Sequence, residues 1–301
     1  MEEIIKETKS GSKIHLYNYN DVKNPKAAIL IVHGASEHFG RYHDFAKFLI
    51  KNDYNVIGFD ILGHGKSAET YDYIYFKNNE ADESVALALD FLKDTYPKTQ
   101  HFLLGHSMGS FIARKILIDY KDDFSKAIIS GTTYMGGFIT SFGMFICNIL
   151  KLFHNDLYIS KFLSNISMDS MPNKMLKDHM INSKDEWITH DEKIVKYYKE
   201  AKDCGQPFTV NAYKQMYKWI NYVCKKKNIK KANLNTPLLF INGLDDALSN
   251  YGNDVRKLVK IFYNIGYKDI SHIEYANMRH EVLNEIDNEK VYQDIINFLV
   301  K

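Results

Sequence analysis

The sequence predicts an α/β protein with a mostly parallel central sheet, helices on both faces and an inserted helical cap. Largely apolar runs at residues 27–32, 56–60 and 101–104 are typical of strands buried on both faces, as in a parallel sheet. Between these runs apolar residues recur at helical spacing, as at Phe45 and Leu49. Strands that alternate with amphipathic helices predict a sheet covered on both sides.

Composition favours one large domain, or a core domain that carries an insertion, because the chain has 301 residues of which 45% are hydrophobic. The 39 Lys and Arg residues nearly balance the 37 Asp and Glu residues, so overall charge gives no case for nucleic acid or an acidic partner. The three cysteines, Cys147, Cys204 and Cys224, are odd in number, widely spaced and free of a Cys-x-x-Cys pair, which argues against a disulfide framework and a zinc site.

We expect a cytoplasmic protein. The first residues are acidic and lack the basic and apolar regions of a signal peptide. The uncharged, largely apolar stretch at residues 135–150 is shorter than the roughly 20 apolar residues that span a bilayer.

The first half of the chain supplies five expected strands joined by helices. The expected strands lie at residues 14–19, 27–32, 56–60, 101–104 and 127–130, the first of them as an antiparallel edge strand. The connecting helices are expected around residues 42–49, 85–92 and 111–116.

The alternation of strands and helices stops after residue 130. Up to about residue 235 no strand-like run appears, and the chain instead shows aromatic and Met-rich helical stretches. The sheet pattern then resumes with strands at 238–241 and 269–275 and helices at 255–262 and 291–299. We therefore expect a core from residues 1–130 and 236–301, with residues 131–235 inserted as a helical cap.

A Gly-x-Ser-x-Gly motif at residues 105–109 lies where a strand-like run ends and a helical pattern begins. A turn of this kind holds the serine in a strained, exposed conformation, and its glycines allow a close crossing of strand and helix. The five residues alone are also compatible with an ordinary glycine-containing turn. Their position between strand and helix is what indicates that Ser107 is a nucleophile.

A serine hydroxyl needs a histidine base and an acid that orients the histidine. The loop at 242–246 contains Asp245 and Asp246, and the loop at 276–281 contains His280. Both loops follow expected parallel strands and should reach the carboxyl edge of the sheet, where Ser107 also lies. A single loop Asp or His usually has a structural role, but the order serine, acid, histidine at three strand ends predicts a catalytic triad.

The chain resembles, over nearly its whole length, the α/β-hydrolases that include monoacylglycerol lipases and bacterial lysophospholipases, which are grouped with serine aminopeptidase-like hydrolases. The residues that carry the resemblance are the stretch 33–38 with Arg41 and Tyr42, Asp60 with 63–67, 105–110, Gly243 with Asp246, 279–281 with Asn284 and Glu285, and the cap stretches 187–192 and 204–209.

The resemblance implies an α/β-hydrolase fold with Ser107, Asp246 and His280 as the triad, the acid being Asp246 rather than Asp245. It also implies an oxyanion hole formed by the backbone N–H groups of Ala35 and Met108. No cofactor and no metal are expected. Ser36 departs from the family pattern, which usually has Gly or Ala at this position.

The expected activity is hydrolysis of a small-molecule lipid ester with one acyl chain, a monoacylglycerol or a lysophospholipid, through an acyl-enzyme. The apolar cap stretch supports a lipid: we expect Phe138, Phe142, Phe145 and Ile146 to line an acyl-chain tunnel, and the stretch could also touch a membrane as a peripheral contact. The alternatives are that these residues only pack the cap onto the core, and that the same triad hydrolyses a small non-lipid ester, thioester or peptide. An inactive hydrolase scaffold that only binds ligands fits less well, because all three triad residues are present.

Overall fold

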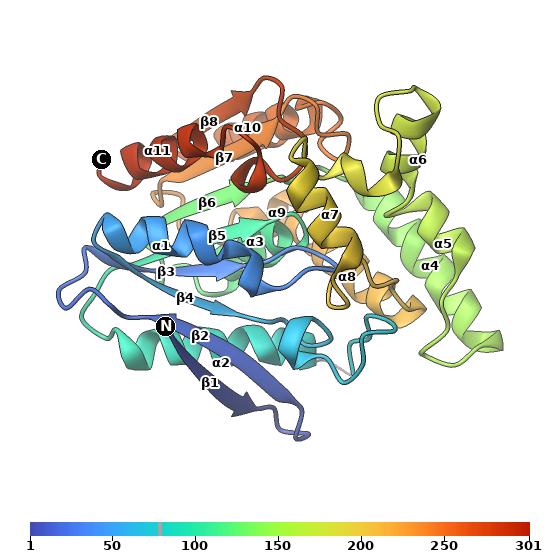
Figure 1. Cartoon of the computed structure of the whole chain (residues 1–301), viewed down its shortest axis with the longest axis horizontal. Helices are drawn as coiled ribbons and strands as arrows, with labels where there is room; N and C mark the ends of the chain where they lie inside the picture. Colours follow the sequence, from blue (N-terminus) through green and yellow to red (C-terminus); the bar gives the residue numbers. More distant parts are fainter. Residues whose placement is uncertain (78–79) are drawn as a thin grey trace.

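The computed structural model describes residues 1–77 and 80–301. It is built on an eight-stranded sheet with the strand order β1-β2-β4-β3-β5-β6-β7-β8 (Figure 1). Pairing is antiparallel between β1 and β2 and between β2 and β4, and parallel across the rest of the sheet. The strands are β1 (Glu2–Glu7), β2 (Lys13–Tyr19), β3 (Ala27–Val32), β4 (Tyr54–Phe59), β5 (His101–His106), β6 (Lys126–Ser130), β7 (Leu238–Gly243) and β8 (Ile270–Tyr275).

The predicted mostly parallel sheet is confirmed, with one difference at its edge. The strand expected at the edge, β2, pairs with a further strand on its outer side, β1. Five of the six residues of β1 are exposed, and the remaining one, Ile4, is half-buried. The strand therefore carries no alternation of buried and exposed residues that would mark it in the sequence.

Helices cover both faces of the sheet because alternate residues of the central strands point to opposite sides. On one face α1 (His43–Lys51) and α11 (Asn288–Leu299) pack against residues such as Ile31. On the other face, residues such as Val32 belong to the core formed with α2 (Glu80–Thr95), α3 (Met108–Asp119) and α10 (Asn253–Ile265). Short 3₁₀ helices also occur in the core loops at Phe39–Tyr42, Gly65–Ser67 and Val282–Asn284.

The chain between β6 and β7 is helical, and most of it lies beyond the carboxyl ends of the parallel strands (Figure 1). One isolated bridge, between Ile74 and Phe208, ties this region to the loop that follows β4. None of the helices described is both long and apolar enough to cross a bilayer. The helices of the region are α4 (Gly137–Phe153), α5 (Lys161–Ile166), α6 (Ser170–Lys177), η3 (Lys184–Trp187), α7 (Glu192–Glu200), α8 (Val210–Val223) and α9 (Lys226–Ile229).

Candidate active site

Ser107 occupies the sharp turn between β5 and α3. Its backbone has φ 52° and ψ −119°, a region that a residue with a side chain adopts only when the surrounding structure enforces it. The flanking glycines supply that enforcement. A Cβ atom on Gly109 would collide with the main-chain oxygens of Val32 and His33, and one on Gly105 would collide with the main chain of Gly109. The close crossing of β3, β5 and α3 therefore presents the Ser107 side chain at the carboxyl edge of the sheet.

His280 and Asp246 arrive at this edge from the loops after β8 and β7. His280 Nδ1 lies 3.1 Å from Asp246 Oδ2, a distance suited to an ion pair although the contact is not an aligned hydrogen bond. Burial alone would lower the pKa of His280, but the charge of Asp246, assisted by those of Glu281 and Glu37, outweighs it and raises the pKa above its usual value. The other ring nitrogen, Nε2, has no hydrogen-bond partner within residues 1–77 and 80–301.

The structure brings Asp246, and not its neighbour Asp245, to His280. Asp246 is fully buried, and its Oδ1 accepts the N–H of Leu248 at 2.9 Å. The Asp245 side chain is 38% exposed, and its carboxylate lies 3.8 Å from Nε2 of His190. The two acids are therefore distinguished by their surroundings.

The loop at residues 34–37 lies beside Ser107 and is fixed in place by hydrogen bonds to neighbouring core residues. Glu37 accepts the N–H of Gly34 at 2.6 Å and the hydroxyl of Tyr42 at 2.8 Å. The Arg41 guanidinium donates to Glu37 Oε2 at 2.6 Å. It also donates to both carboxylate oxygens of Glu281, at 2.7 and 2.6 Å. Because Glu281 directly follows His280, one buried guanidinium connects this loop to the histidine loop.

Ser36, which departs from the family pattern, ties the same loop to the cap. Its backbone has φ 53°, and its hydroxyl donates to the carbonyl of Gln206 at 2.8 Å. In return the N–H of Gly205 donates to the carbonyl of Ser36 at 2.8 Å. A Gly or Ala at this position would lack the first of these two bonds.

A cavity of about 290 Å³ contains Ser107 and His280 in its wall, together with Ala35 and Met108. Much of its remaining lining is apolar and comes from α3, from the cap helices and from the segments between them. The apolar residues include Phe111, Met135, Met168, Pro172, Met216 and Ile220.

The four cap residues expected to line an acyl-chain tunnel do not line this cavity. Phe138, Phe142 and Phe145 are exposed at 84%, 53% and 58%, and Ile146 packs against the core. The reason is the packing of α4 on α8, in which Gly143 contacts Tyr217 and Thr140 accepts a hydrogen bond from Asn221 at 2.7 Å. That contact buries the small-residue side of α4 and turns its aromatic side outward.

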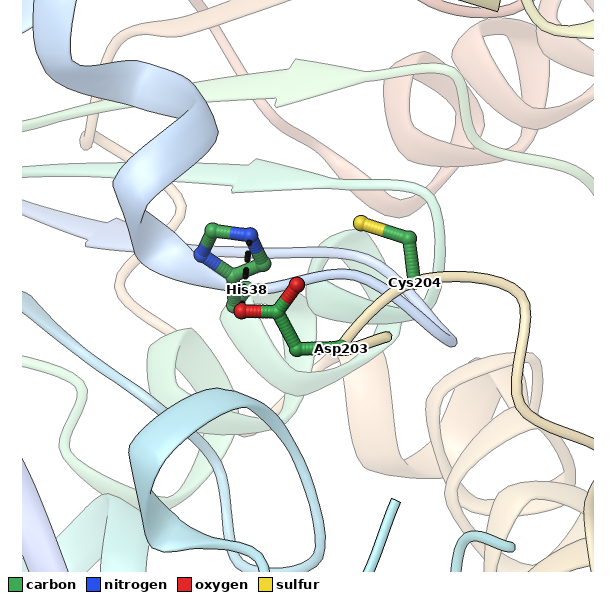
Figure 2. A group of neighbouring side chains, drawn as sticks. All are labelled: His38, Asp203 and Cys204. Carbon is green, nitrogen blue, oxygen red and sulfur yellow. Dashed lines mark ion pairs between the residues drawn. The ribbon is translucent and has the colours of Figure 1, made fainter. Parts of the chain in front are cut away.

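Among the described residues, one group outside the triad has the donor types of a metal site: His38, Asp203 and Cys204, whose ligand atoms lie within 4.8 Å of one another (Figure 2). His38 Nδ1 accepts the N–H of Gly40 at 3.1 Å, so in the neutral ring the proton resides on Nε2. Nε2 lies 3.4 Å from Asp203 and 3.2 Å from the hydroxyl of Tyr197. Coordination through Nε2 would need that proton on Nδ1, where it would face the Gly40 N–H.

Burial raises the pKa of the Cys204 thiol to about 12, so the thiol is protonated in the metal-free protein. The contacts of His38 with Asp203 and Tyr197 fasten the cap to the core loop.

Sequence reasoning gave no role to Trp187, although it lies in one of the cap stretches that carry the resemblance. Its indole stacks on the His280 ring with the ring centroids 4.6 Å apart and an angle of 21° between the planes. A second ring packed on His280 is that of His106, with the ring centroids 4.8 Å apart and an angle of 48° between the planes. Stacking of this kind depends on the docking of the cap and leaves no local signal in the sequence.

Comparison with known proteins connects this site to enzymes. A family model described as serine aminopeptidase, S33, matches residues 23–287. The chain is 25% identical over 282 residues to a monoglyceride lipase homolog from Monkeypox virus, a match that covers 91% of this chain and 92% of that protein. It is also 25% identical over 269 residues to phospholipase YtpA from Bacillus subtilis, covering 89% of this chain and 93% of that one.

The solved structure of a thermostable carboxyl esterase from Bacillus coagulans, in complex with glycerol, superposes with a TM-score of 0.87. The superposition covers 99% of this chain and 97% of the esterase at 21% identity, and it shows that the two proteins share the α/β-hydrolase fold.

Proposed function

The chain belongs to the serine aminopeptidase S33 family of α/β-hydrolases, and on this basis we propose that it is a serine carboxylic-ester hydrolase whose substrate is a monoacylglycerol or a lysophospholipid. The observation that carries the proposal is the apolar cavity between the core and the cap, which contains both Ser107 and His280 in its wall. In this proposal residues 1–130 and 236–301 supply the chemistry, and residues 131–235 supply much of the acyl-chain pocket, with α3 completing its wall.

The proposed reaction begins when His280 Nε2 takes the proton of the Ser107 hydroxyl as Oγ attacks the ester carbonyl. The backbone N–H groups of Ala35 and Met108 stabilise the negative charge that develops on the carbonyl oxygen. Removing one donor from such a hole typically costs about 3–4 kcal/mol of transition-state stabilisation. Asp246 keeps the proton of the neutral ring on Nδ1 and stabilises the imidazolium that forms.

The acyl-enzyme then forms as the leaving alcohol receives the proton from His280. A water molecule, activated by the same histidine, attacks the acyl-enzyme and releases the fatty acid and Ser107. The residues that the scheme needs all come from the carboxyl edge of one sheet, where substrates bind in open α/β folds.

Two features support a lipid substrate. The cavity lining contains several methionines, whose flexible side chains adapt to an apolar ligand. Two relatives that match over most of their length have the names monoglyceride lipase homolog and phospholipase. Both names describe hydrolysis of glycerol-based lipids, and they differ in the head group.

We expect kcat/KM for p-nitrophenyl esters to rise with acyl-chain length from the acetate until the cavity is filled. Each buried methylene contributes about 0.8 kcal/mol, which corresponds to roughly a fourfold gain per carbon. A series of even-numbered esters, assayed below their aggregation concentration, measures this slope. A flat profile, or one with its maximum at acetate, would favour the small-ester alternative and contradict the lipid substrate.

We also propose that the aromatic side of α4 contacts lipid surfaces. The helix has Lys151 as its one charged residue, and six of its large apolar side chains are exposed by more than half. An exposed face made of several large apolar side chains is typical of an interaction surface. The six residues are Phe138, Ile139, Phe142, Phe145, Leu152 and Phe153.

The double variant Phe138→Ser/Phe142→Ser should bind phosphatidylcholine vesicles with an affinity at least about tenfold lower, since a fully buried Phe contributes roughly 1.5–3 kcal/mol. Co-sedimentation with the vesicles measures this affinity. Hydrolysis of soluble short-chain esters should remain unchanged. Tyr263→Ser, which removes an aromatic ring exposed at 60% on α10, is the matched control. Equal vesicle binding by the double variant and the wild-type protein would contradict this contact.

A further inference from the structure

We propose that Trp187 is a positioning residue for His280: the cap places its indole face on the imidazole and thereby stabilises the protonated ring during acyl transfer. The inference rests on the proposed function, in which His280 is the base, and adds to it a part for the cap in the chemical step.

The stacking geometry supports a direct interaction between the two rings. The centroids lie 4.6 Å apart with nearly parallel planes, which is within the range in which a cation over an indole face is attracted. His280 is only 2% exposed, so little water competes for the charge that the ring acquires. Desolvation makes such a contact stronger than it would be on the surface.

The residues on both sides of His280 hold the cap segment that carries Trp187. The Arg279 guanidinium donates to the carbonyls of Glu186 at 2.6 Å and Thr189 at 3.1 Å. The N–H of Glu281 donates to the carbonyl of Ile188 at 2.7 Å. These bonds hold the main chain on both sides of Trp187 against the two residues next to His280, so the stack does not depend on the packing of the two rings alone.

The chemistry of the proposed reaction gives the stack its role. As the Ser107 Oγ forms its bond to the acyl carbon, its proton moves to His280 Nε2, and the ring becomes a cation until it passes that proton to the leaving alcohol. The negative face of an indole favours the charged form of the ring over the neutral one. Trp187 therefore contributes more in the transition state than in the resting enzyme, which is the condition for acceleration.

The other groups around His280 define what the indole adds. Asp246 faces its Nδ1, and Glu281 and Glu37 add further negative charge at longer range. His106 covers part of the ring from β5, but burial lowers its pKa well below the usual value, so it stays neutral. Arg41 is paired with both Glu37 and Glu281.

The test is site-specific replacement of Trp187 by mono-, di- and trifluorinated tryptophan, which weakens the negative face of the indole in steps with little change of shape. We expect kcat/KM to fall progressively, by about 2- to 30-fold over the series. A weaker face also lowers the pKa of His280. Since the base must be neutral in the free enzyme, the acidic limb of the pH profile of kcat/KM should move to lower pH.

The same replacements at Trp219 are the control. Trp219 is buried in the core, and its indole N–H donates to Asp82 at 2.8 Å, so neither the rate nor the pH profile should change in steps. A rate and an acidic limb that do not vary with fluorination at position 187 would overturn the proposal. Failure of the proposed function would look different, because the protein with natural Trp187 would then lack esterase activity and would not react with a fluorophosphonate at Ser107.

Discussion

Ser107→Ala is expected to lower kcat for ester hydrolysis by about 10⁶-fold, the loss typical of removing a triad nucleophile. The residual rate would come from the oxyanion hole and from substrate binding. KM should change little, because the substitution removes one oxygen and leaves the cavity wall intact. The measurements are kcat on p-nitrophenyl esters and covalent labelling by a fluorophosphonate probe.

Ser167→Ala is the matched control, since Ser167 also lines the cavity but lies in the cap. It should keep a rate within a few-fold of the wild-type rate and should still be labelled. If the fluorophosphonate labels the Ser107→Ala variant as efficiently as the wild-type protein, another residue is the nucleophile and the proposed reaction is wrong.

Asp246→Asn is expected to lower kcat/KM by on the order of 10⁴-fold, because an amide neither holds His280 in the required tautomer nor stabilises its charged form. The carboxylate raises the pKa of His280, so its removal should lower that pKa. The acidic limb of the residual pH profile should then move to lower pH. Steady-state rates measured across the pH range check both effects.

Asp245→Asn separates the two neighbouring acids. The Asp245 carboxylate is partly exposed and lies near His190 rather than His280, so this variant should stay within a few-fold of the wild-type rate. Equal losses for Asp245→Asn and Asp246→Asn would show that the effect arises from the loop as a whole, and the assignment of Asp246 as the acid would fail.

The parts of the fold that could be predicted are those in which local pattern and burial coincide. Strands β3 and β4 are buried along their whole length. This appears in the sequence as an uninterrupted apolar run in β3 and as a largely apolar run, broken by Asn55, in β4. Strand β1 is held by pairing with β2 while its side chains remain largely exposed. Its formation depends on a long-range partner, and no local pattern reports it.

In the candidate site too, some features follow from local sequence pattern and others depend on long-range packing. The position of Ser107 follows from the transition between strand and helix, and the placement of Asp246 and His280 at one sheet edge follows from topology. The orientation of Phe138 depends instead on which side of α4 packs on α8, and that choice is made by small residues such as Gly143. An amphipathic pattern reveals an apolar side of a helix without telling whether a cavity, the core or solvent lies against it.

The hydrogen bonds from Ser36, Arg279 and Glu281 to the inserted region have a consequence for protein engineering. The insertion joins the chain at two points in sequence, but it is anchored through residues that lie outside it, on both sides of the catalytic machinery. A chimera that exchanges residues 131–235 for those of a homologue keeps every triad residue. It keeps these anchors only if the new insertion places main-chain carbonyls where those of Glu186, Ile188 and Gln206 lie, because the acceptors are all backbone groups. Successful grafts should therefore match the donor side chains at positions 36 and 279 to the backbone path of the new insertion.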